Sequence, residues 1–165
     1  MGASITIRRY RSGDESAIKD LVVSIMGREF REDAAAYPTE DLESIERSYG
    51  KIGDIFFVAE SGSQVIGTVA IKKEDDRIAL LRRLFVDPQF RNQKLGVKLI
   101  DRALEFCREV GYQELVFRTT SRMEGAIRLC QKKGFTQRAK IQLGDFELLK
   151  FTLHLANGHP SVKSA

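Results

Sequence analysis

The stretch LRRLFVDPQFRNQKLGVKLIDRAL, residues 81–104, decides the fold of this chain. An apolar run of the kind found in buried strands ends at Pro88, and an amphipathic pattern that predicts a helix begins at Gly96. Side-chain donors, among them Arg91 and Lys94, lie between the two. A helix start carries unpaired backbone N–H groups and a partial positive charge, and a glycine lets its backbone approach a ligand closely. The stretch therefore suits an anionic group such as a diphosphate, although a loop that only caps a surface helix would look the same.

The positive charge of the chain is concentrated here. The whole protein has a formal net charge of +4, and residues 82–102, with six Lys or Arg and two Asp residues, carry the same excess. A local positive field favours an anionic ligand, whereas a solvated helix with scattered lysines is the simpler explanation. A nucleic-acid binder would use the same basic side chains, but few aromatic residues lie among them and the net charge is low for that class, so we expect no nucleic-acid partner. The basic residues are Arg82, Arg83, Arg91, Lys94, Lys98 and Arg102.

Predicted strands and helices extend from this stretch in both directions. The sequence predicts strands over 4–10, 54–60, 64–73, 77–87, 114–120 and 146–155, helices over 12–30, 38–50, 96–111 and 121–134, and one more strand before the last. Ser121 and Glu124 have capping-box spacing, and Gly50, Gly111 and Gly134 are expected to end helices. This order of elements predicts a mixed sheet with helices on both faces.

The size and composition of the chain predict one globular domain. It has 165 residues, of which 42% are hydrophobic and 30% are charged. We assign the domain to residues 1–155 and expect the small polar tail, 156–165, to be disordered. No apolar window suits a membrane span, no signal peptide is visible, and Cys107 and Cys130 form neither a disulfide framework nor a metal-ligand pattern. We therefore expect a cytoplasmic protein without a metal or a membrane partner.

The stretch resembles the acetyl-CoA motif of the GNAT superfamily of N-acetyltransferases, in which a strand ends in a V-x-P-like turn and R/Q-x-x-G-x-G/A leads into a helix. Arg91 takes the R/Q position and Gly96 that of the last glycine, while Lys94 replaces the middle glycine. FFVAESGSQVIGTVAI (56–71) and LVFRTTSRMEGAIRLCQKKGF (115–135) resemble further elements of the same family. Together the resemblance covers nearly all of the assigned domain, in the right order.

The resemblance implies an α/β (α+β) GNAT fold: a mixed, twisted sheet of about six to seven strands that splays between the fourth and fifth strands. It implies an acyltransferase that moves an acetyl group from acetyl-CoA, its cosubstrate, to a primary amine of a small molecule or peptide, by direct attack in a ternary complex. Backbone groups of the fourth strand would hold the pantetheine arm and polarise the thioester. We expect the protein to be a monomer or a homodimer. The residues implied in cosubstrate binding are Leu84, Phe85, Val86, Arg91, Asn92, Gln93, Lys94, Leu95, Gly96 and Val97.

One departure from the family concerns the base that takes the proton of the amine. Many members carry a Glu on the fourth strand, but Leu80 stands at that position and cannot accept a proton. Glu60 is our candidate base, and the acids of the turn 74–76 are weaker candidates. Both sites have the simpler explanation of an exposed acid at a strand end or in a turn. Ordered water could take the proton instead, without a dedicated residue.

A second departure concerns Cys130, which replaces the tyrosine that usually protonates the leaving thiolate. A thiol, with a pKa of about 8.5, is a weaker donor of shorter reach than a tyrosine hydroxyl, with a pKa of about 10. Cys130 could still be that catalytic acid, could be a nucleophile that forms an acetyl-cysteine, or could simply pack in the core. Lys94 is a further departure: if its position requires a positive φ, it is strained by ~1–2 kcal/mol.

The acceptor is the part that the sequence determines least. Residues 31–46 carry several acids, which suit either a cationic amine at the acceptor mouth or a solvated helix face, whereas Arg118 could bind a carboxylate. Peptide N-termini, lysine, polyamines, amino acids and small amines all remain open. Leu80 and Cys130 also keep open the alternative of a non-catalytic acyl-CoA-binding or sensing protein of the same fold.

Overall fold

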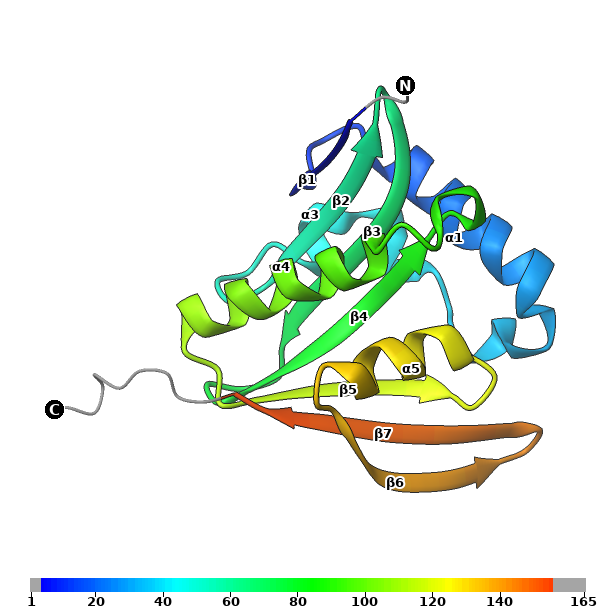
Figure 1. The fold of residues 1–165 in the computed structure, drawn as a ribbon, viewed down its shortest axis with the longest axis vertical. Helices are drawn as coiled ribbons and strands as arrows, with labels where there is room; N and C mark the ends of the chain where they lie inside the picture. Colours follow the sequence, from blue (N-terminus) through cyan, green and yellow to red (C-terminus); the bar gives the residue numbers. More distant parts are fainter. Residues whose placement is uncertain (1–3, 156–165) are drawn as a thin grey trace, which may run out of the picture.

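The computed structural model describes residues 4–155, which form a seven-stranded mixed sheet with helices on both faces (Figure 1). The strand order is β1-β2-β3-β4-β5-β7-β6, which confirms the predicted mixed sheet. The tail 156–165, expected to be disordered, lies outside the described residues. Within the described part of the chain, no helix is long and apolar enough to cross a membrane. The strands are β1 Ile5–Arg9, β2 Ile55–Ser61, β3 Gln64–Lys73, β4 Ile78–Val86, β5 Glu114–Thr120, β6 Thr136–Leu143 and β7 Phe146–His154.

The helices differ from the prediction mainly before β2. The expected single helix over 38–50 is two short helices, because Ser44 has an extended backbone (φ −147°, ψ 92°). Gly111 and Gly134, predicted to end helices, adopt φ values of 99° and 100°, which glycine reaches without strain. The helices are α1 Glu15–Glu29, α2 Glu40–Glu43, α3 Ile45–Ser48, α4 Leu95–Val110 and α5 Glu124–Lys132, with 3-10 helices η1 Arg31–Ala36 and η2 Pro88–Phe90.

The capping box predicted at the start of α5 is wrong. The helix begins at Glu124, and Met123 precedes it without a side-chain cap. The backbone N–H of Ser121 donates instead to the carbonyl of Glu147 in β7, at 3.0 Å. Ser121 is therefore tied to the sheet and lies outside the helix that it was expected to cap.

Both faces of the sheet are packed, which agrees with the apolar run in β2. Successive side chains of a strand point to opposite faces. Phe57 belongs to the core that includes Leu99 of α4, whereas Phe56 and Val58 belong to the core that includes Ile18 of α1. Strands covered on both faces are expected to have continuous apolar runs of this kind.

The parallel strands β4 and β5 lie side by side at their starts and then diverge (Figure 1). The last pair of their ladder is Leu81 opposite Phe117. Beyond it β4 continues to Val86 and β5 to Thr120 without pairing with each other. The predicted splay between the fourth and fifth strands is confirmed, and it leaves one edge of the β4 backbone without a β5 partner.

A β-bulge lies in β4 where the two strands separate. Thr68 pairs with Phe85 and Ala70 with Arg82, so β4 has one residue more than β3 over this interval. Within it, Arg83 adopts φ 54°, a left-handed conformation that costs an L-residue roughly 1–2 kcal/mol. Bulges of this kind bend a strand and redirect its side chains. The bulge therefore helps to turn the end of β4 away from β5.

Candidate functional site

A cavity of about 1040 Å³ lies between the diverging end of β4, the start of α4 and helix α5. It brings together every residue that the sequence predicted to bind the cosubstrate except Gln93. Two Glu residues also line it, but basic residues outnumber them. The basic residues are Arg91, Lys94, Arg122, Arg128 and Lys132. The cavity is thus positively charged at the N-terminus of α4, where a helix binds anions best.

The loop before α4 contains two residues in the left-handed conformation. Asn92 has φ 67° and Lys94 has φ 64°, and both line the cavity. Lys94 is the residue immediately before α4, so it occupies the strained conformation that glycine would adopt freely. Residues 95–97, the first of the helix, line the cavity as well. The chain thus retains the backbone shape of a glycine loop with a lysine in its middle position.

We expect Lys94→Gly to raise the free energy of unfolding by about 0.5–1 kcal/mol. The substitution removes roughly 1–2 kcal/mol of left-handed strain, and part of this gain is lost to the greater freedom of glycine in the unfolded chain. Urea unfolding measures the difference. Lys98→Gly, at an exposed position inside the same helix, is the matched control and should lose about 1 kcal/mol. Equal losses in both variants would contradict the strain at Lys94.

Gly96 lets α4 pack closely on α5, against the side chain of Leu129. A Cβ atom at this position would lie 2.6 Å from Cδ1 of Leu129, too close for any real contact. Arg91 connects the loop to two other elements: its Nη1 donates to Oε1 of Glu29 in α1 at 2.9 Å, and its Nε donates to the carbonyl of Val86 at 3.1 Å. Both residues therefore shape the cavity that they line.

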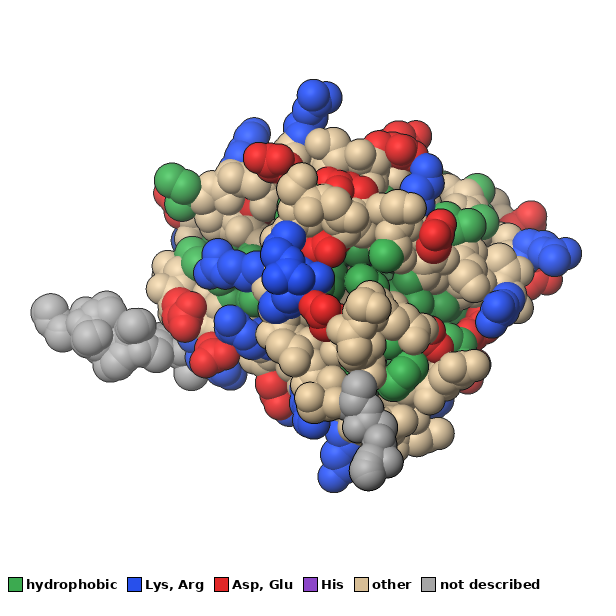
Figure 2. Space-filling model, turned by 90° about the horizontal axis from the view of Figure 1, so that it is seen from above, with side chains coloured by type: hydrophobic (Ala, Val, Ile, Leu, Met, Phe, Trp, Pro, Cys, Tyr) green, Lys and Arg blue, Asp and Glu red, His purple; other side chains and the backbone are tan. Residues whose placement is uncertain are grey.

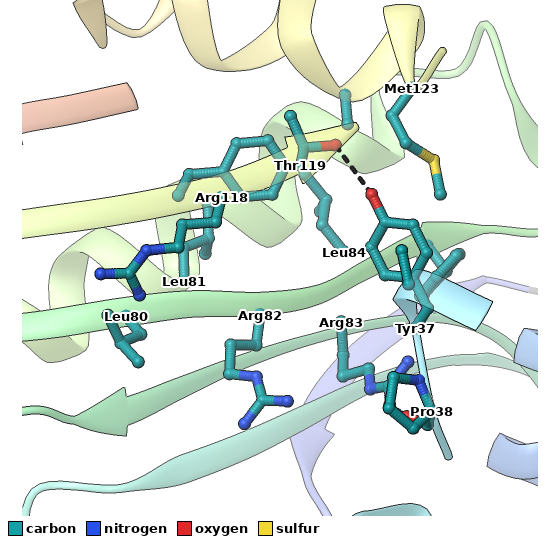
Figure 3. A pocket seen from close by; sticks show the side chains of 14 residues that line it. Tyr37, Pro38, Leu80, Leu81, Arg82, Arg83, Leu84, Arg118, Thr119 and Met123 are labelled. Atoms are coloured by element: carbon teal, nitrogen blue, oxygen red, sulfur yellow. Dashed lines mark hydrogen bonds between the residues drawn. The ribbon is translucent and has the colours of Figure 1, made fainter. Parts of the chain in front are cut away.

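A second cavity, of about 300 Å³, adjoins the first between β4 and β5 (Figure 3). Most of its lining is apolar, and its charged residues are all arginines. Tyr37 lines it, and the hydroxyl of this residue lies 3.2 Å from Oγ1 of Thr119. The residues that line both cavities are Leu84, Phe85, Met123 and Ala126. The two cavities thus meet at the end of β4, where the thioester is expected.

Asp33 in η1 is a fully buried carboxylate beside this second cavity, and sequence reasoning did not single it out. It accepts hydrogen bonds from Oγ1 of Thr120 at 2.5 Å and from Nη1 of Arg122 at 2.6 Å. In the same segment the hydroxyl of Tyr37 accepts a hydrogen bond from the backbone N–H of Thr120 at 2.8 Å. Buried charges are stable only when paired. These contacts hold the segment between α1 and α2 against the end of β5.

Asp41 in α2 holds the bulge of β4. Its two carboxylate oxygens accept from Nε and Nη2 of Arg83 at 3.0 and 2.5 Å, and the Tyr49 hydroxyl donates to it at 2.6 Å. Burial acts to raise the pKa of Asp41, but the hydrogen bonds and the charge of Arg83 outweigh it and hold that pKa below its usual value. Glu43 pairs with Lys19. These acids neutralise cations, so the acidic acceptor mouth considered for this segment does not form at the cavity lining.

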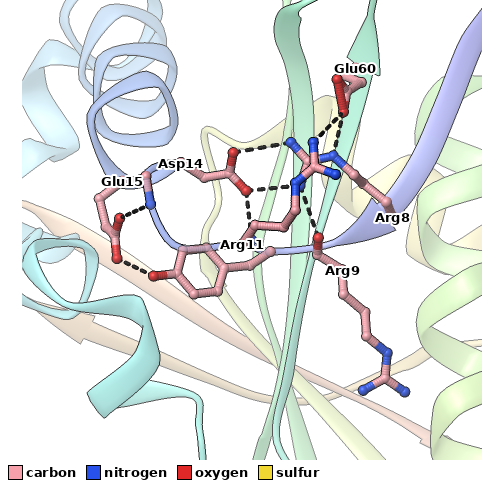
Figure 4. Close-up of polar contacts among 8 residues, drawn as sticks. Arg8, Arg9, Arg11, Asp14, Glu15 and Glu60 are labelled. Carbon is pink, nitrogen blue, oxygen red and sulfur yellow. Dashed lines mark hydrogen bonds and ion pairs between the residues drawn. The ribbon is translucent and has the colours of Figure 1, made fainter.

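Glu60, the candidate base, lies away from both cavities. Its carboxylate forms ion pairs with Arg8 and, at 3.8 Å, with Arg11, and its side chain is 19% exposed (Figure 4). Asp14 accepts from the same Arg8 guanidinium at 2.9 Å. Since β3 separates β2 from β4 in the sheet, the position of Glu60 supports a structural ion pair and does not support a catalytic base.

Cys130 packs in the main hydrophobic core. Its side chain is fully buried, it lines neither cavity, and burial raises its pKa to about 12. A thiol in this state has almost no thiolate for nucleophilic attack and no route to the leaving sulfur. Of the three roles considered, the geometry favours packing.

The basic residues around β4 and α4 do not form one continuous surface. Arg83 is buried on Asp41, while Arg102 pairs with Glu105 at 3.1 Å and lies 4.6 Å from the ring centroid of Phe57. On the face seen in Figure 2, Asp and Glu side chains lie among the Lys and Arg side chains. This arrangement gives no support to a nucleic-acid interface, which needs a basic patch or stripe.

Comparison with known sequences identifies one family. Residues 19–135 match the "Acetyltransferase (GNAT) family". An N-acetyltransferase 8F1 of Rattus norvegicus is 34% identical over 116 residues, which are 67% of this chain and 52% of that protein. N-acetyltransferase 8F1 of Mus musculus is 31% identical over 151 residues, 86% of this chain and 68% of that protein. The chain spans about half the length of the first curated relatives that it matches.

Solved structures share the fold at lower sequence identity. An acetyltransferase of Streptococcus agalactiae superposes with a TM-score of 0.82 and 22% identity, covering 92% of this chain and 98% of that one. YncA of Salmonella typhimurium, a putative acetyltransferase solved with its cofactor acetyl-CoA, superposes with a TM-score of 0.75 and 22% identity, covering 92% and 94%. At this level of identity the likeness concerns the fold alone.

Proposed function

Because the chain belongs to the acetyltransferase (GNAT) family, we propose that it transfers an acetyl group from acetyl-CoA to a primary amine by direct attack in a ternary complex. The observation that carries the proposal is the meeting of two cavities at the end of β4. One is large and positively charged, as a CoA site must be, and the other is small and mostly apolar. A thioester at their junction would be open to an amine from the smaller side.

The larger cavity would hold the cosubstrate. The N-terminal N–H groups of α4, after the left-handed Lys94, would bind the diphosphate. Arg128 and Lys132 of α5 line the same cavity and could meet a further phosphate as charge-assisted donors. The pantetheine arm would lie along β4 beyond Leu81, where no β5 backbone competes for its hydrogen bonds. Leu84, Phe85 and Val86, whose backbone groups were predicted for this role, line that cavity.

The chemistry requires one bond to form and one to break. The neutral amine nitrogen attacks the acetyl carbonyl, and backbone N–H groups at the end of β4 would stabilise the tetrahedral oxyanion. The C–S bond then breaks, and its electron pair leaves with the CoA thiolate. The nitrogen loses one proton and the thiolate gains one, so amide and free CoA are the products.

The residues that line the smaller cavity, here called the acceptor cavity, determine which groups could accept that proton. None of its lining residues is an Asp or a Glu. We therefore infer that ordered water accepts the proton from the amine, with the Tyr37 hydroxyl as a polar group that could hold that water. In this route neither Glu60 nor Cys130 has a catalytic role, since Glu60 is paired with Arg8 and Cys130 is buried in the core.

Calorimetric titration of acetyl-CoA tests the proposal. We expect micromolar binding by the wild type, a loss of about 10- to 100-fold in Arg91→Ala, and no detectable binding in Gly96→Glu. The new glutamate adds a negative charge and a side chain where only 2.6 Å separates a Cβ from Leu129. Lys98→Ala, exposed on the same helix and outside the cavity lining, is the control and should bind normally. Absence of binding by the wild type would end the enzyme proposal.

A non-catalytic acyl-CoA binder is the second candidate, and the lack of a carboxylate in the acceptor cavity favours it. Release of CoA in the presence of a panel of primary amines separates the two. Turnover of any amine supports the enzyme, whereas binding of acetyl-CoA without turnover across the panel supports the binder.

A further inference from the structure

The charges around the acceptor cavity bear on the kind of amine that it takes. Three arginines line it, and no acid does. The charge of Arg83 is neutralised by Asp41, whose two carboxylate oxygens both accept hydrogen bonds from the guanidinium group. The other two, Arg82 and Arg118, come from the two strands that border the cavity (Figure 3).

Arg82 and Arg118 are neighbours at the point where β4 and β5 separate. The last paired residues, Leu81 and Phe117, belong to the core on the α4 side of the sheet. Because side chains alternate along a strand, the next residue of each strand projects from the opposite face. Like charges on neighbouring strand positions repel. Arg82 and Arg118 therefore follow the last paired residues of two adjacent strands and both line the smaller cavity, where their charges would stabilise a bound anion.

Contacts within the protein leave these two guanidinium groups with donors to spare. Among the residues drawn in Figure 3, Arg118 makes no hydrogen bond, and its side chain is exposed. Arg82 lies 5.9 Å from the ring centroid of Tyr49. Its nearest acid is Asp41, at 3.9 Å, whose oxygens Arg83 already occupies. A planar guanidinium can bind a carboxylate through two parallel hydrogen bonds.

We propose that the acceptor is an α-amino acid with an apolar side chain, whose carboxylate is bound by Arg118 and Arg82. This inference rests on the proposed acetyl transfer. The cavity, at about 300 Å³, is at the small end of ligand sites, which suits a molecule of this size. Leu80, Phe117 and Met123 give it apolar walls for the side chain. Polyamines, by contrast, would bring an additional ammonium group and no carboxylate to a site that already holds two arginine charges.

The position of the arginines also fits the reach of such a molecule. The bulge at Arg83 lies between Arg82 and Leu84 and bends β4 at this point. Arg82 is two residues before Leu84, which lies at the junction of the two cavities. An amine and a carboxylate on the same carbon can thus be directed to the thioester and to the arginines at once.

Matched acceptors test this inference in the whole 165-residue chain. The rate of CoA release would be measured with L-leucine, L-methionine and L-phenylalanine, with their amides, and with spermidine. The amides keep the amine and the side chain but lack the negative charge. We expect kcat/KM for each amino acid to exceed that of its amide by about 10- to 100-fold in the wild type, since a charge-assisted pair contributes on that scale.

Variants of Arg118 then test whether this arginine causes the preference for amino acids over their amides. Arg118→Gln should bring the acid-to-amide ratio close to one, Arg118→Lys should keep part of it, and both should bind acetyl-CoA with unchanged affinity. Arg108→Gln removes an exposed arginine of α4 outside both cavities and should leave the ratio intact.

Each result has a definite reading. Normal acetyl-CoA binding with equal turnover of acids and amides, with turnover of spermidine alone, or with turnover of none of these amines overturns the inference and leaves acetyl-CoA binding standing. A wild-type preference that Arg118→Gln does not reduce also overturns the assignment. Failure to bind acetyl-CoA would remove the proposed function itself, and this inference with it.

Discussion

Asp41→Ala is expected to lower the free energy of unfolding by about 3–5 kcal/mol, a large part of the stability of a single domain. The side chain of Arg83 is only 5% exposed, and the variant leaves its guanidinium group without a counter-ion. The remaining partner would be the carbonyl of Pro38, to which Nη2 donates at 2.5 Å. A buried charge without a partner costs more than the pair contributed. Urea unfolding at neutral pH measures the loss.

Two controls separate the buried pair from a general effect of losing an acid. Asp20→Ala removes an exposed acid of α1 and should change the stability by less than about 0.5 kcal/mol. The double variant Asp41→Ala with Arg83→Gly removes both charges and the left-handed strain. It should therefore be more stable than Asp41→Ala alone. A double variant that is less stable would show that the pair is not what stabilises the bulge.

The same variant has a defined dependence on pH. The pKa of Asp41 is lower in the folded protein than in the unfolded chain, where it is about 3.9. Its contribution is therefore complete above that unfolded pKa and is lost as the pH falls through the folded one. The difference between wild type and Asp41→Ala should be full at pH 7 and should shrink below pH ~4. A difference that stays constant down to pH 3 would contradict the charged pair.

Asp33→Ala is expected to lower stability by about 2–3 kcal/mol and kcat/KM by at least about 10-fold. It removes the buried acceptor for Thr120 and Arg122, which ties η1 to the end of β5. Tyr37 follows in the same segment and lines the acceptor cavity, so this wall should become mobile. Urea unfolding and the rate of CoA release with a saturating acetyl-CoA concentration measure the two effects.

The neighbouring Glu32 provides the matched control. Its side chain is 79% exposed and lies 3.9 Å from the same Arg122, so Glu32→Ala should cost at most about 1 kcal/mol and leave kcat/KM unchanged. If Asp33→Ala is destabilised while its kcat/KM is that of the wild type, η1 is not part of the acceptor site.

The elements that sequence reasoning located well are those whose signal is local. The strand expected over 64–73 is found with the same bounds, and so is the one over 114–120, because each combines apolar residues with clear turn residues at its ends. The splay of the sheet was different, since it followed from a resemblance and not from any pattern in β4 or β5. Nothing in the periodicity of either strand indicates where their pairing stops.

The contacts that shape the site depend on distant segments, and so they left no local signal. Asp33 is one of several acids in its stretch, and its burial depends on Thr120, 87 residues away. Glu60 looked available because the sequence does not reveal that β1 places Arg8 beside it. An arginine inside an apolar strand likewise does not predict a bulge. Nothing in the sequence therefore indicates that Arg83 adopts a backbone conformation typical of glycine.

The shared wall of the two cavities has a consequence for how this protein can acquire new acceptors. Leu84, Phe85, Met123 and Ala126 line both cavities, so a change in any of them alters the proposed donor and acceptor sites together. Leu80 and Arg118 line only the smaller cavity. Under the proposed assignment of the cavities, substitutions at these two positions are expected to change acceptor choice and to leave the larger cavity intact. Divergence in substrate range is therefore expected to concentrate in residues that line the smaller cavity alone, with the shared wall held nearly fixed.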